Sequence, residues 1–186
     1  MNKIAIILAD GFEDIEAITP YDQLKRAGIE VDLITINTSL TAISSHGLKM
    51  VANKFIGDTN FKDYVGIVIP GGTIGVNNLK QCNKLVDTLI EYNKQNKLIG
   101  AICAAPTILI ELGIIDKQKY TCYPGMQKES SNYSDDPVVV SNNLITSTFC
   151  GTSSYFGIAI IDYILGSEMA NKISNQTLYK GKTNVK

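Results

Sequence analysis

The sequence predicts an α/β protein whose mostly parallel β-sheet is covered by helices on both faces. Short apolar runs of strand length alternate along the 186 residues with longer segments whose apolar residues recur at helical spacing. Turn residues, mainly glycine, proline and asparagine, separate most of these segments. At this length we expect one domain, residues 1–186, with a sizeable core.

The first strand is predicted over the apolar residues 3–8, and a glycine at position 11 turns the chain out of it. A helix follows over 13–27, because Gly28 is suited to ending a helix. A second strand is predicted over 29–36. The residues of this helix that we expect to face the core are Ile15, Ile18 and Leu24.

A β-hairpin is predicted next, beside the main sheet, because residues 37–60 hold two short alternating runs. The runs cover 40–43 and 48–52, and the polar turn between them is Ser44-Ser45-His46-Gly47.

The rest of the chain repeats the alternation of apolar strands and helices. The predicted strands are 65–69, 98–102, 138–140, 144–148 and a short one at 121–124. The predicted helices are 79–93, a segment that opens at Pro106, 152–165 and 167–178.

Chemistry is expected where the parallel strands end, because ligands of open α/β sheets gather at the carboxyl ends of strands. Three loops qualify: residues 10–16, residues 70–75 and the turn at Cys103. Because they follow three different strands, they converge only if the parallel sheet is correct.

Cys103 lies between a buried strand and a helix that Pro106 opens, as in a nucleophile elbow. Free amide groups and the helix dipole at such a turn favour the thiolate, which is a nucleophile. The alternative is a small core residue. The other cysteines lack this strand-turn-helix setting: Cys82, Cys122 and Cys150.

The adjacent glycines Gly71 and Gly72 follow a predicted strand. Their N–H groups can approach an oxyanion beside the sulfur, although glycines also form plain tight turns. The segment lacks a P-loop or GxGxxG pattern, so nucleotide binding has little support.

Three acidic residues, Glu13, Asp14 and Glu16, open the first helix, where the helix dipole stabilises them. Glu16 follows Ile15, which we expect to face the core, so Glu16 should be the least solvated of the three. A buried carboxyl group held against Cys103 can accept or donate a proton.

The chain has a single histidine, His46, in the hairpin turn. It can pair with Cys103 only if the hairpin folds over that turn; otherwise it is simply exposed. The only arginine, Arg26, lies in the last turn of the first helix, where the dipole explains it and anion binding is the alternative.

Composition argues against several classes of protein. The hydrophobic content of 45% and net charge of −1, without a basic stripe, are typical of an ordinary globular domain and not of a nucleic-acid binder. The four cysteines form no CxxC motif, so we expect neither disulfides nor a metal site. No signal peptide or membrane span is recognisable, so we expect a cytoplasmic protein with reduced thiols and no membrane partner.

Taken together, several segments resemble the ThiJ/PfpI superfamily and, within it, the branch of the parkinsonism-associated deglycase. They follow the family's order and span most of the chain: residues 8–16, 25–28, 68–72, 101–107, 145–147 and 151–153.

The resemblance implies a flavodoxin-like three-layer sandwich, a homodimer and no cofactor. It implies that Cys103 is the reactive, readily oxidised cysteine, that Glu16 shares a proton with it, and that Gly72 and Ala104 supply oxyanion donors. The residues that it places around the substrate are Gly71, Arg26, Tyr123 and Cys150.

Two departures from the family pattern bear on activity. Tyr123 stands where many relatives have a histidine, so a general base is missing and a protease-like triad is disfavoured. Cys150 stands where many relatives have proline, either as a thiol that resolves oxidised Cys103 or as a small apolar filler.

Two functions remain open at this point. The resemblance favours a glyoxalase or deglycase, acting through Cys103 and Glu16 on a small dicarbonyl or glycated substrate. The alternative is a redox-responsive protective or chaperone-like protein whose Cys103 is oxidised to sulfinate without significant turnover.

Overall fold

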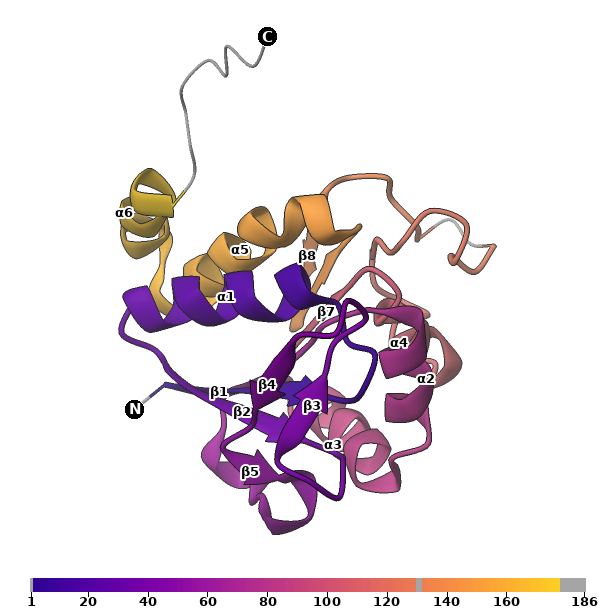
Figure 1. Cartoon of the computed structure of the whole chain (residues 1–186). Coiled ribbons are helices and arrows are strands. Elements are labelled where there is room, and N and C mark those ends of the chain that lie inside the picture. Colours follow the sequence, from indigo (N-terminus) through magenta and orange to yellow (C-terminus); the bar gives the residue numbers. More distant parts are fainter. Residues whose placement is uncertain (1, 130–131, 178–186) are drawn as a thin grey trace, which may run out of the picture.

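The computed structural model describes residues 2–129 and 132–177 of the chain (Figure 1). Its middle layer is a seven-stranded sheet in the order β5-β2-β1-β6-β7-β9-β8. Neighbouring strands are parallel except for the antiparallel pair β8 and β9, which confirms the predicted mostly parallel sheet. The strands are β1 (Lys3–Leu8), β2 (Glu30–Thr35), β5 (Lys54–Phe55), β6 (Gly66–Ile69), β7 (Leu98–Ile102), β8 (Val138–Ser141) and β9 (Leu144–Ser147).

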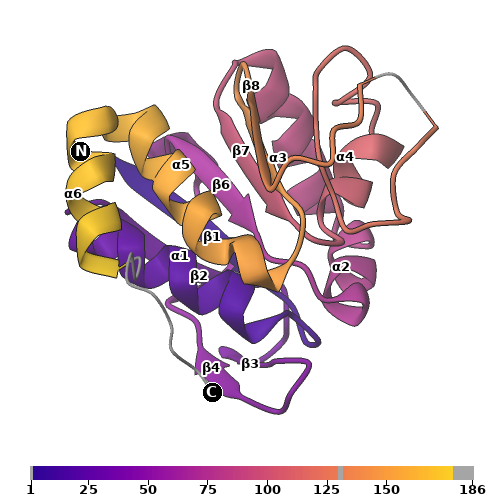
Figure 2. The same cartoon turned by 90° about the horizontal axis from the view of Figure 1, so that it is seen from above.

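Helices cover both faces of this sheet, so the fold is the expected three-layer sandwich (Figure 2). One face is covered by α1 (Asp14–Arg26), α5 (Ser153–Leu165) and α6 (Ser167–Thr177). The other is covered by α2 (Thr73–Lys80), α3 (Asn83–Lys94) and α4 (Pro106–Glu111). The last residue of the predicted final helix, 178, lies outside the described residues. No helix in the described ranges is long and apolar enough to span a membrane.

The central strands are apolar throughout because both of their faces are buried. Along β1, Ala5 and Ile7 belong to the core under α2–α4, whereas Ile4, Ile6 and Leu8 belong to the core under α1, α5 and α6. Each strand of the centre therefore contributes to both cores.

The predicted hairpin is present as a separate two-stranded sheet of β3 (Thr41–Ile43) and β4 (Lys49–Val51). It is held to the loop after β1 by main-chain hydrogen bonds, among them Gly11 N to Ile43 O at 2.7 Å and Ser45 N to Phe12 O at 2.8 Å. The hairpin turn is thereby fixed at the carboxyl end of β1.

Two sequence predictions of secondary structure are wrong. The helix expected over 79–93 corresponds to α3 but begins only at Asn83, and the separate helix α2 that precedes it was not predicted. Residues 121–124 form no strand, since the only ladder contact near them is an isolated bridge between Tyr120 and Tyr133.

The predicted core face of α1 is also wrong in part. Leu24 is buried, but Ile15 and Ile18 are 50% and 40% exposed. The helix instead packs on α5 at Gly157, whose absent side chain leaves room for Gln23 and Pro20. This close approach rotates the isoleucines outward.

Candidate active site

The three loops picked out from the sequence meet at the carboxyl ends of the neighbouring strands β1, β6 and β7. The main chain of Glu13 donates to Gly71 O at 3.0 Å, and that of Gly75 donates to Gly11 O at 3.2 Å. The expected convergence is therefore confirmed, and it follows from the parallel pairing of the strands.

Cys103 directly follows β7 and has a φ of 64°, in the left-handed region that residues other than glycine seldom adopt. Its N–H donates to Ser147 O at 2.9 Å, and its carbonyl accepts from Tyr123 N at 2.8 Å. These bonds from two other segments hold the sharp strand-to-helix turn, with Pro106 as the first residue of α4.

The half-buried side chain of Cys103 lines a cavity of about 340 Å³. The residues around this cavity come from the three loops, the hairpin turn and the segment after Tyr123: Gly11, Glu13, Ser45, Gly72, Thr73, Ile74, Cys103, Ala104, Tyr123 and Met126.

Glu16, in the first turn of α1, is fully buried, and its Oε2 accepts a hydrogen bond from Gly71 N at 2.7 Å. A Cβ atom at Gly71 would lie 2.6 Å from Glu16 Oε2 and 2.7 Å from Cys103 Cβ. Only glycine therefore fits between the two side chains. The burial of Glu16 agrees with expectation, but the reason differs, because Ile15 faces outward.

The carboxyl of Glu16 and the thiol of Cys103 are electrostatically coupled. Burial raises the pKa of Glu16 to about 7, against the opposing hydrogen bond from Gly71. Burial, followed by the charge of Glu16 and the hydrogen bond to it, raises the pKa of Cys103 to about 12, although the amides of Ala104 and Gly72 act in the opposite direction.

The expectation that the turn alone favours the thiolate is therefore wrong, since burial and Glu16 outweigh the local amides. Two interacting acids lose their protons in two steps that belong to the pair. The first loss is near pH 7, and the second is strongly opposed. Above about pH 7 the pair thus holds a single transferable proton, which is what a nucleophile and its proton carrier require.

The other predicted site residues divide into two groups. Tyr123 is half-exposed and lines the Cys103 cavity, whereas Arg26 and Cys150 do not line it. Arg26 lies about 15 Å along α1 from Glu16 and pairs with Asp22 at 2.6 Å. Cys150 begins the short 3₁₀ helix after β9.

His46 lies near the mouth of the site but contacts acidic groups, not Cys103. Its Nδ1 is 2.7 Å from Asp14 Oδ2 and 3.6 Å from Glu13 Oε1. Sequence reasoning did not single out Ser45 and Met126, which line the cavity. The polar turn was a signal for Ser45, whereas Met126 lies in an irregular segment with no periodic pattern.

The sequence and the structure of this chain are both similar to those of known proteins. A family model described as the DJ-1/PfpI family matches residues 2–163. Protein DJ-1 homolog B of Arabidopsis thaliana is 35% identical over 95% of this chain, which spans only 41% of that relative's length. Glutathione-independent glyoxalase DJR-1.2 of Caenorhabditis elegans is 34% identical over 92% of this chain and 94% of its own. A structure of oxidized Toxoplasma gondii DJ-1 superposes with a TM-score of 0.92 at 30% identity, covering 97% of this chain and 100% of that one.

Proposed function

Because this chain belongs to the DJ-1/PfpI family, we propose that it has a DJ-1-type protective function and removes reactive dicarbonyls such as methylglyoxal. The observation that carries the proposal is the buried Glu16 carboxyl beside the Cys103 thiol, at a cavity of about 340 Å³. A relative named as a glutathione-independent glyoxalase supports the same reaction class.

The reaction begins when the Glu16 carboxylate takes the proton of the Cys103 thiol and the sulfur attacks the aldehyde carbon of methylglyoxal, forming a C–S bond as the C=O π bond opens. The amides of Gly72 and Ala104 stabilise the developing oxyanion. The oxygen then takes a proton, which Glu16 supplies, and the product is a hemithioacetal.

Glu16 next removes the hydrogen on the former aldehyde carbon as a proton and returns it to the neighbouring carbon, while the hydroxyl proton passes to the oxygen on that neighbouring carbon. This internal redox step converts the hemithioacetal into a lactoyl thioester. Water cleaves the C–S bond, so the net change is methylglyoxal plus water to lactate plus a proton. The same first steps on a glycated amine or thiol constitute deglycation.

Lactate formation tests this proposal. Methylglyoxal is supplied to the reduced chain and lactate is identified by NMR for wild type, Cys103→Ser and Glu16→Gln. We expect both variants to lose lactate formation, while Cys82→Ser, which changes another half-buried thiol, keeps it. Wild-type turnover in Cys103→Ser, or no lactate from folded, reduced wild type, would contradict the proposal.

A second candidate function is that of a redox-responsive protective protein. Tyr123, in place of a histidine, lines the cavity and leaves fewer proton carriers for turnover, whereas the amides that face the sulfur also suit a sulfinate. Mass spectrometry after mild peroxide treatment distinguishes this function. Oxidation confined to Cys103 supports it, and oxidation spread evenly over the four cysteines contradicts it.

We propose that the chain works as a homodimer in a reducing compartment such as the cytoplasm. Ile15 and Ile18 of α1 are both exposed, and a second copy packed against this helix would bury them. All four cysteines are free thiols, which agrees with a reducing compartment.

A further inference from the structure

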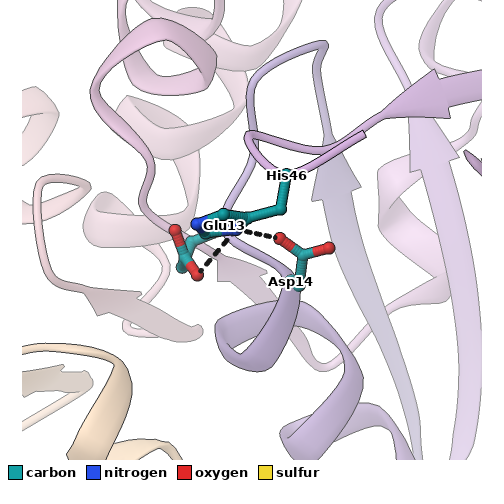
Figure 3. Close-up of side chains that lie close together, drawn as sticks. All are labelled: Glu13, Asp14 and His46. Carbon is teal, nitrogen blue, oxygen red and sulfur yellow. Dashed lines mark hydrogen bonds and ion pairs between the residues drawn. The ribbon is translucent and has the colours of Figure 1, made fainter. Parts of the chain in front are cut away.

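Figure 3 shows a second group of titratable side chains, of which Glu13 also lines the Cys103 cavity. Glu13 and Asp14 are at the start of α1, whereas His46 belongs to the turn between β3 and β4. The three side chains point toward one another, and one ligand atom from each lies within 4.8 Å of the others.

The backbone under these residues is fixed. Ile43 N donates to Asp10 Oδ1 at 2.8 Å, and Ser45 N donates to Phe12 O at 2.8 Å. The hairpin turn is thus attached to the loop that leads into α1, and His46 is held opposite the two carboxylates. The arrangement is assembled by the fold before any ligand arrives.

The imidazole serves only one of the two carboxylates. Its Nδ1 lies 2.7 Å from Asp14 Oδ2, at hydrogen-bond distance, but 3.6 Å from Glu13 Oε1. In the described ranges neither carboxylate has an ion pair with lysine or arginine. The imidazole thus satisfies Asp14 but not Glu13, and a single cation between the three atoms would contact both carboxylates.

We propose that Glu13, Asp14 and His46 form a binding site for a divalent transition-metal ion of the zinc type. One imidazole with two carboxylates is a nitrogen and oxygen donor set that suits such ions. This proposal does not depend on the dicarbonyl activity.

The present distances are close to those that such an ion requires. Tetrahedral Zn²⁺ with ligand bonds of about 2.1 Å separates its ligand atoms by about 3.4 Å. The 3.6 Å between His46 Nδ1 and Glu13 Oε1 already matches this separation. The 2.7 Å between His46 Nδ1 and Asp14 Oδ2 must open slightly as the ion replaces the shared proton.

Each of the two carboxylates accepts a hydrogen bond from a serine hydroxyl, which fixes its orientation. Ser44 Oγ donates to Asp14 Oδ1 at 2.6 Å, and Ser45 Oγ donates to Glu13 Oε2 at 3.0 Å. In each case the oxygen bound by serine is not the one nearest His46, so the other oxygen stays available. Outer hydrogen bonds of this kind are typical of metal-ligating carboxylates.

Glu13 and Ser45 line the same cavity as Cys103, so the ion would lie at the rim of the reactive site. Three protein ligands leave one position of a tetrahedral ion for water or a ligand in the cavity.

The test titrates Zn²⁺ into the untagged, reduced chain at neutral pH. Binding is followed by calorimetry and by the nitrogen resonances of the imidazole, which are unambiguous because His46 is the only histidine. We expect one equivalent to bind and to shift these resonances. His46→Gln should abolish this binding, and Asp14→Asn and Glu13→Gln should each weaken it at least about tenfold.

Two control variants show whether Zn²⁺ binds at the proposed site or elsewhere on the chain. Asp22→Asn makes the same change on the same helix away from the site and should leave binding unchanged. Cys103→Ser should also retain one equivalent; loss of binding there would assign the ion to the thiol and overturn the proposal. Unshifted imidazole resonances at one equivalent, or full binding by His46→Gln, would overturn it as well.

Discussion

The carboxyl group of Glu16 and the thiol of Cys103 lie side by side and interact, although 87 residues separate them in the chain. The backbone of Gly71 lies between the two side chains and donates to Glu16. The relationship therefore depends on three strands of the parallel sheet, and it joins the most nucleophilic side chain of the cavity to a proton carrier.

The reactivity of Cys103 should follow the first proton loss of this pair. We expect the rate of alkylation by iodoacetamide to rise with a midpoint near pH 7, where Glu16 titrates. In Glu16→Gln the buried thiol must ionise alone, so the midpoint should move upward. Mass-resolved alkylation rates at each pH check this, and a midpoint unchanged by Glu16→Gln would contradict it.

The burial of Glu16 should make the free energy of unfolding depend on pH. The folded-state pKa of Glu16 is about 7 and its ordinary value is 4.5, so stability falls as pH rises between these values. The loss is at most about 3 kcal/mol, at 1.36 kcal/mol per pKa unit.

Urea unfolding of wild type and Glu16→Gln at pH 4 and pH 8 measures this dependence. The variant should gain stability relative to wild type at the higher pH, because it keeps a hydrogen-bond acceptor for Gly71 without a charge. If the free energies of unfolding of the variant and wild type differ by the same amount at both pH values, the pKa of Glu16 is not raised.

Gly72→Ala should be far more destabilising than Gly28→Ala. Both glycines have positive φ, 88° and 80°, so both substitutions strain the backbone, by about 1–3 kcal/mol. A Cβ at Gly72 also overlaps the Gly11 carbonyl oxygen, whereas no atom of the described residues lies within 4 Å of a Cβ at Gly28. Thermal unfolding of the two variants should separate the effect of backbone strain from that of the steric overlap. Equal losses of stability would show that the overlap at Gly72 contributes nothing.

Ile18→Glu should shift the proposed dimer toward monomer. Ile18 is 40% exposed on the outer face of α1, so a charge there costs little within one copy but opposes an apolar contact between two. Light scattering after size-exclusion chromatography measures the mass. The control is Val140→Glu, an equivalent change at an exposed residue of β8, which should leave the mass unchanged.

Much of the fold was predictable because strand burial leaves a local signature. The continuous apolar runs of β1, β6 and β7 predict strands that are buried on both faces, and their boundaries agree with the structure to within a residue. Helix α2 was missed because Gly75, Asn77 and Asn78 within it are poor helix formers. The face of α1 was missed because Gly157, far along the chain, decides how closely α5 approaches.

By itself, the sequence determined most of the order of strands and helices, the turn that carries Cys103, and the set of loops at the carboxyl end of the sheet. These follow from hydrophobic periodicity and turn chemistry, which act between residues close in the chain. Only the tertiary structure decided that Glu16 and Cys103 are coupled, that Arg26 lies away from the cavity, and that His46 faces two carboxylates. Burial, pKa values and contacts between loops depend on which elements pack together, and local patterns in the chain do not encode that packing residue by residue.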